Sequence, residues 1–307
     1  MDAATQRAMA GFEAAAPDGP AGLAVRGYLA EQARAFLTHS ALPMQQAAAV
    51  RLRAACRRVG SALAACRDLV DPVWAGELGT ELEATARVLA AERDAEAVRP
   101  RLLAPLDRWI TEVRYPDGGA ARTRTLLTRM LDRERSAAHS AATAALVGPA
   151  FHALADRMAT LARDVPLTPA AERPCADVLP EIAGAAYERW HRHAGQLPEP
   201  LLAEDAEGDA RWLAAVTVTE TALHATELCR PAGAVVGGQD PAALITRFTL
   251  VAGALTEQRD AVLAAECVHR AADTPRIAAT TGYVLGRLHE EQRLAVLRAR
   301  SSAPLLD

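Results

Sequence analysis

The sequence predicts an all-α protein. Apolar residues recur at three- and four-residue steps through long segments such as 74–89 and 244–255, and the alternation typical of β-strands is nearly absent. Half of the 307 residues are hydrophobic, but only 4% are aromatic. The core must therefore be built from Ala, Leu and Val, a composition that suits helices packed closely on small side chains.

Proline residues divide the chain almost in half. The segment 166–180 contains four prolines and separates two regions of helical periodicity. We therefore expect a first helical bundle over residues 21–165, a linker over 166–180 and a second bundle over 181–302. Residues 1–20 are expected to be disordered, as chain ends commonly are.

The composition argues against a secreted or membrane-spanning protein. The five cysteines form no CxxC pair, so we predict neither a disulfide framework nor a zinc site, and we expect buried thiols in a reducing cytoplasm. No signal peptide is recognisable at the N-terminus. The uncharged run 136–155 reaches membrane-spanning length, but it is mostly Ala and includes several polar residues. We interpret it as a buried bundle helix and expect no membrane contact.

The basic residues are unevenly distributed. All 34 are Arg; residues 1–164 contain 21 Arg and 19 acidic residues, a net charge of +2, whereas residues 165–307 contain 13 Arg and 19 acidic residues, a net charge of −6. The first half therefore holds most of the potential for binding anions. Within it, Arg residues cluster in 51–58 and 122–135.

Several segments resemble the CHAD family of helical domains. The signature helix of that family is similar to VRLRAACRRVGSAL at 50–63, followed by CRDLVDP at 66–72. Further similarities are LAAERDAE at 89–96, LTEQRDAV at 255–262 and LGRL at 285–288. The resemblance spans roughly residues 21–300. It implies two related bundles of the four-helix type flanking a central basic cleft, and a role in binding inorganic polyphosphate without catalysis.

Arginine is suited to this role because its planar guanidinium donates paired hydrogen bonds to phosphate oxygens. Positions 50, 53, 57 and 60 share one helical stripe, where the resemblance implies His, Arg, Arg and Arg. This chain carries Val50, Arg53, Arg57 and Gly60 there. Our predicted anion-binding residues are Arg53, Arg57 and Arg58, together with a second stripe of Arg122, Arg129 and Arg133.

The second half departs from the family pattern. The second signature His is replaced by Leu213, Glu220 stands where the resemblance implies Lys, and no Arg or Lys lies between Arg211 and Arg230. Binding of inorganic polyphosphate, or of another phosphate-containing ligand, should therefore be weak and only shallowly dependent on salt.

An alternative is a degenerate CHAD scaffold that binds a protein partner or associates with itself. An open cleft lined by Arg53 and Arg57 would favour anion binding. Burial of Leu213, Val216 and Leu223 in a dry core would favour the scaffold.

We expect no enzymatic activity, cofactor, metal or nucleic-acid partner. The sequence contains no Gly-rich phosphate loop and no nucleophile elbow. Glu220, His224 and Glu227 have the spacing of a helical metal site, but such a site requires a second copy on another helix, and none occurs. We therefore expect a surface or capping role for these three side chains.

Overall fold

The computed structural model describes residues 18–41, 46–112, 114, 117–200, 206–230 and 235–303. Over these residues the chain is almost entirely helical, and its strand-like pairing is limited to isolated bridges such as Val70 with Leu167. The all-α prediction is confirmed. The expectation for residues 1–20 concerns mainly 1–17, which lie outside the described residues.

The described helices divide between the two halves of the chain. The first half contains α2 (Ala21–Ser40), α3 (Gln46–Ala65), α4 (Pro72–Thr111), α5 (Gly119–Leu146) and α6 (Pro149–Leu161). The second half contains the 3₁₀ helix η1 (Pro169–Glu172), then α7 (Cys175–Ala194), α8 (Ala206–Cys229), α9 (Pro241–Ala272) and α10 (Ala279–Ser301). Helix α3 packs on α8 and α4 packs on α9, so corresponding helices of the two halves meet.

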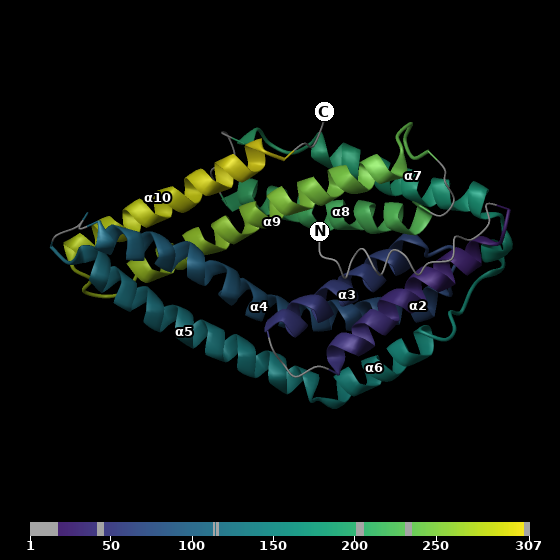
Figure 1. Ribbon diagram of the computed structural model, residues 1–307, viewed down its shortest axis with the longest axis horizontal. Helices are drawn as coiled ribbons and strands as arrows, with labels where there is room; N and C mark the ends of the chain where they lie inside the picture. The colour runs from purple at the N-terminus through teal and green to yellow at the C-terminus, as the bar shows by residue number, and fades with distance from the viewer. Residues whose placement is uncertain are drawn as a thin grey trace.

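The molecule is elongated. At one end the α4–α5 pair meets the α9–α10 pair, and α2, α3, α7 and α8 gather toward the other end (Figure 1). Each of the longest helices, α4 and α9, begins with the same local signal, an Asp-Pro pair. The Asp71 carboxylate accepts a hydrogen bond from the Trp74 amide at 2.8 Å, and Asp240 accepts one from the Ala243 amide at 3.3 Å. Proline fits the first helical position because its missing N–H would have no partner there.

Two apolar clusters hold the halves together. The larger one combines α2, α3 and the first part of α4 with α7, α8 and the first part of α9, and includes Trp190 and Phe248. The second cluster joins the last parts of α4 and α9 to the first parts of α5 and α10, around Leu106 and Leu288. Each half contributes to both clusters, so apolar packing between the halves is extensive.

Two details differ from the sequence-based expectations. Helix α7 begins at Cys175, within the segment 166–180 that the sequence assigned to a linker, and accommodates Pro180 in its second turn. The run 136–155 is not a buried helix: α5 ends at Leu146, α6 begins at Pro149, and most side chains of the run are exposed. Among the described helices, none combines the length and apolar composition needed to cross a bilayer.

Four charged residues form reciprocal ion pairs where α4 crosses α9. The Arg93 Nη2 donates to Asp260 Oδ2 at 2.8 Å, and the Arg259 Nη2 donates to Asp94 Oδ2 at 2.6 Å. The four side chains are between 11% and 23% exposed. Each helix supplies one Arg-Asp dipeptide, from the similar sequences at 89–96 and 255–262. The pairing therefore joins the two halves at equivalent positions.

Candidate functional site

A groove between the two halves lies beside this crossing. It encloses about 600 Å³ and is lined by Arg53 and Arg57 of α3, Arg87 of α4, and Thr217 and Thr221 of α8. We call it the arginine groove. Three glycines, one from α3 and two from α4, also line it, and a Cβ added to any of them would meet nothing within 4 Å. These bare positions leave the groove open between the helices.

Of the three arginines in the groove, Arg53 has the fewest partners among the described residues. Its Nε is buried and has no hydrogen-bond partner among the described residues. Burial, followed by the neighbouring charges of Arg57 and Arg259, lowers the pKa of Arg53 to about 10, against the opposite influence of Glu220 and Asp94. The guanidinium remains charged at neutral pH. A partly buried cation without a full set of acceptors is stabilised by any anion that enters.

Arg57 lies one turn from Arg53 and forms an ion pair with Glu220 of α8. Both side chains are 22% exposed. The helix that corresponds to α3 in the second half therefore presents a carboxylate to Arg57. Any anion that binds Arg57 must compete with this carboxylate.

Arg58 lies outside the arginine groove. Its Nη2 donates to Glu227 Oε1 at 3.3 Å, and the buried Tyr28 hydroxyl donates to Glu227 Oε2 at 3.1 Å. Burial, followed by the charge of Glu227, holds the pKa of Tyr28 well above its usual value. Arg58 thus links α3 to α8 and α2 and does not line the groove with Arg53 and Arg57.

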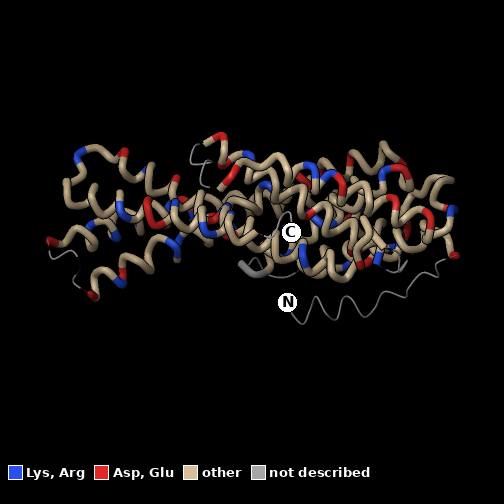
Figure 2. Tube along the Cα trace, turned by 90° about the horizontal axis from the view of Figure 1, so that it is seen from above, with Lys and Arg blue, Asp and Glu red and all other residues tan. Residues whose placement is uncertain are grey.

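The second predicted stripe lies on α5 and does not meet the first. Arg122, Arg129 and Arg133 are exposed, and Arg122 donates to the Asp117 carbonyl at 2.7 Å and to Thr280 Oγ1 at 3.1 Å. Helix α5 packs mainly on α4 and α10, on the outer side of the molecule (Figure 1). Basic and acidic residues are mixed along the described part of the trace (Figure 2).

Glu220, His224 and Glu227 of α8 do not have the surface or capping role that the sequence predicted. Glu220 and Glu227 pair with Arg57 and Arg58, and His224 is buried between these ion pairs. Burial lowers the pKa of His224 well below its usual value, and the charges of Arg58 and Arg57 lower it further. In the described part of the chain, no group of three or more metal-ligating side chains is present.

Arg87, Thr217 and Thr221 are lining residues that the sequence did not single out. Arg87 pairs with Glu83 at 2.8 Å, four positions earlier on α4, which is the pattern of an ordinary surface ion pair. Only the placement of α4 beside α3 reveals that it faces the groove. Thr217 and Thr221 lie on α8, in the segment between Arg211 and Arg230 that contains no Arg or Lys.

The structure meets the criterion for anion binding and part of the criterion for a scaffold. The cleft lined by Arg53 and Arg57 is open, as anion binding requires. Val216 and Leu223 are each 8% exposed and belong to the larger apolar cluster, whereas Leu213 is only partly buried. Helix α8 thus buries its apolar side chains and still presents hydroxyls to the groove.

The fold and the groove together define a duplicated helical domain with an arginine-lined cleft between its halves. A family model described as the CHAD domain matches residues 27–226. The chain belongs to the CHAD family.

Solved structures resemble nearly the whole chain. PptA from Streptomyces chartreusis is 34% identical over 92% of this chain and 97% of that one, with a TM-score of 0.78. The crystal structure of the CHAD domain from the plant Ricinus communis is 18% identical over 96% of each chain, with a TM-score of 0.63, and shows likeness of fold. No curated protein matches the chain.

Proposed function

We propose that this protein binds inorganic polyphosphate, or a related phosphate anion, in the arginine groove and does so without catalysis. The observation that carries the proposal is the Arg53 guanidinium, whose buried Nε lacks a hydrogen-bond partner among the described residues, beside Arg57 in an open groove. Membership of the CHAD family supports the proposal.

The groove supplies what a phosphate chain needs. Arg53, Arg57 and Arg87 come from two helices and face one cavity. Charge-assisted hydrogen bonds from guanidinium to phosphate oxygens are roughly twice as strong as neutral ones. The hydroxyl of Thr217 adds a neutral donor from the opposite helix, whereas the Thr221 hydroxyl donates to the Thr217 carbonyl at 2.8 Å.

The lining residues also favour ligand binding over catalysis. The thiol in the groove belongs to Cys56, and burial raises its pKa to about 12, so it is protonated and unreactive at neutral pH. None of the described residues lining the groove is a histidine that could act as a base for Ser61 or the threonines.

Titration of the full chain with long-chain polyphosphate at two salt concentrations tests the proposal. By analogy with single-stranded nucleic acids, three arginine contacts give a slope of about −2 for log K against log salt. We expect weaker binding and a shallower slope than in CHAD domains with basic residues in both halves. Undetectable binding at low salt would overturn the proposal and favour the scaffold alternative.

Removing the competing carboxylate should strengthen binding. In Glu220→Gln the anion no longer has to displace an ion pair from Arg57, and we expect affinity to rise about tenfold, which corresponds to about 1.4 kcal/mol. The matched control is Glu227→Gln, because Glu227 pairs with Arg58 outside the groove, and its affinity should stay at the wild-type value. Equal affinities of Glu220→Gln and wild type would contradict the competition.

A further inference from the structure

The arginine groove continues into a second cavity. This cavity encloses about 470 Å³ between the end of α3 and the helices α7 and α8. Ala64 and Thr221 line both the second cavity and the arginine groove, so the two spaces adjoin at these residues. The combined space follows α3 between the two halves of the molecule.

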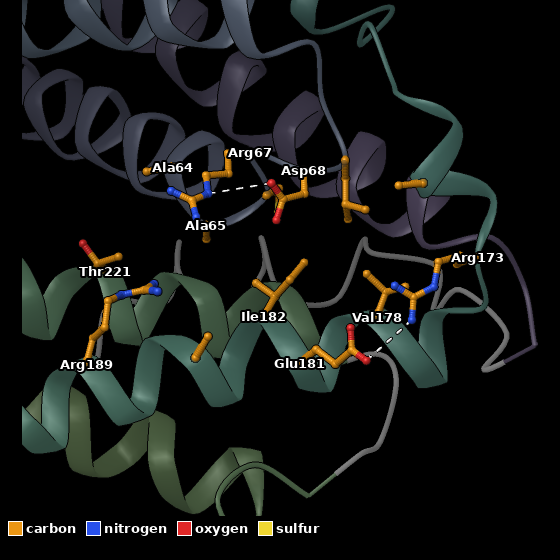
Figure 3. Close-up of a pocket in the computed structure, with 14 residues that line it drawn as sticks. Ala64, Ala65, Arg67, Asp68, Arg173, Val178, Glu181, Ile182, Arg189 and Thr221 are labelled. Carbon is orange, nitrogen blue, oxygen red and sulfur yellow. Dashed lines mark ion pairs between the residues drawn. The ribbon is translucent and has the colours of Figure 1, made fainter.

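Three arginines from separate elements surround the second cavity. Arg67 lies in the turn after α3, Arg173 lies between η1 and α7, and Arg189 lies on α7. Figure 3 shows Arg67 on the α3 side and Arg189 on the α7 side, with Thr221 close to Arg189. Cations from three parts of the chain therefore line one cavity.

These arginines form at most weak ion pairs with the described residues. Arg67 Nε lies 3.7 Å from Asp68 Oδ1, and Arg173 Nη2 lies 3.5 Å from Glu181 Oε1, with all four side chains more than half exposed. Ion pairs this exposed contribute little to stability, so a phosphate group can displace them easily. Among the described residues, none forms an ion pair with Arg189.

We infer that the second cavity is a second anion subsite and that the ligand is a linear polyanion long enough to occupy both spaces. This inference rests on the proposed function of the arginine groove. Arg53 and Ala64 are separated by about 16 Å along α3, which is farther than tripolyphosphate reaches. A long chain that occupies both subsites gains affinity because the second contact is intramolecular.

The test compares two ligands on the full chain, tripolyphosphate and long-chain polyphosphate. In the double variant Arg67→Ala plus Arg189→Ala we expect long-chain affinity to fall at least about tenfold and its salt slope to become shallower by about 1.4. Affinity for tripolyphosphate should not change. The matched control is Arg129→Ala plus Arg133→Ala, which removes the same charge from exposed positions on α5 and should leave both affinities unchanged.

The outcomes separate this inference from the proposed function. Unchanged long-chain affinity in the Arg67 and Arg189 variant, or an equal loss for both ligands, overturns the second subsite while the arginine groove stands. Failure of the wild-type protein to bind either ligand overturns the proposed function, and the second subsite with it.

Discussion

The double substitution Arg53→Ala plus Arg57→Ala is expected to abolish measurable polyphosphate binding. Each charge-assisted hydrogen bond to phosphate contributes about 1.5–3 kcal/mol, so losing both arginines weakens binding between about a hundredfold and ten-thousandfold. The loss is aggravated because Glu220 then keeps its charge without Arg57 to neutralise it. Isothermal titration calorimetry at low salt measures the effect.

Circular dichroism of the same variant shows whether the fold survives. Arg53 and Arg57 line an open groove, so their truncation removes no apolar core, and we expect the helical signal of the wild type. The charge-matched control is again Arg129→Ala plus Arg133→Ala. Should the Arg53 and Arg57 variant be folded and still bind tightly, the anion must bind elsewhere on the protein.

The substitution Asp260→Ala should cost about 3 kcal/mol of the free energy of unfolding. It leaves Arg93 largely buried at the α4–α9 crossing without its main acceptor, and breaking a buried ion pair from one side commonly costs 3–5 kcal/mol. The lower end applies here because Arg93 retains a weaker pair with Asp94 at 3.4 Å. Urea unfolding followed by circular dichroism gives the value.

Two comparisons make this stability measurement specific. Asp132→Ala removes the partner of Arg99 in a pair that is more exposed, and it should cost less than about 1 kcal/mol. Replacing both members of the buried pair, as Arg93→Met plus Asp260→Leu, should recover most of the loss because no unpaired charge remains. A cost for Asp260→Ala as small as that for Asp132→Ala would show that the crossing does not depend on its ion pairs.

The fold was predictable where local signals act alone. Helical periodicity and the Asp-Pro pairs at the starts of α4 and α9 depend on short-range physics. The run 136–155 was misjudged because alanine is compatible with a buried or an exposed helix surface, and only packing decides between them. The start of α7 was also misplaced, since a proline in the first turns of a helix need not end it.

The candidate site was predictable only in part. Arg53 and Arg57 are four positions apart on one helix and necessarily share a face. Arg58 is the next residue and projects about 100° away, so it reaches Glu227 outside the groove. Whether the α5 arginines converge with those of α3 depends on which helices are neighbours, and periodicity does not contain that information. For the same reason, the sequence could not predict that Arg87 lines the groove.

At Gly60, ligand affinity and the stability of the fold can change independently, although the two are usually coupled in evolution. A side chain there would meet no other atom within 4 Å at its Cβ, and replacing a glycine inside a helix generally improves helix propensity. A lineage can therefore gain a cation at this position, or lose it again, without passing through a misfolded intermediate. Ligand affinity at this groove can drift or be selected while the core that supports it stays unchanged.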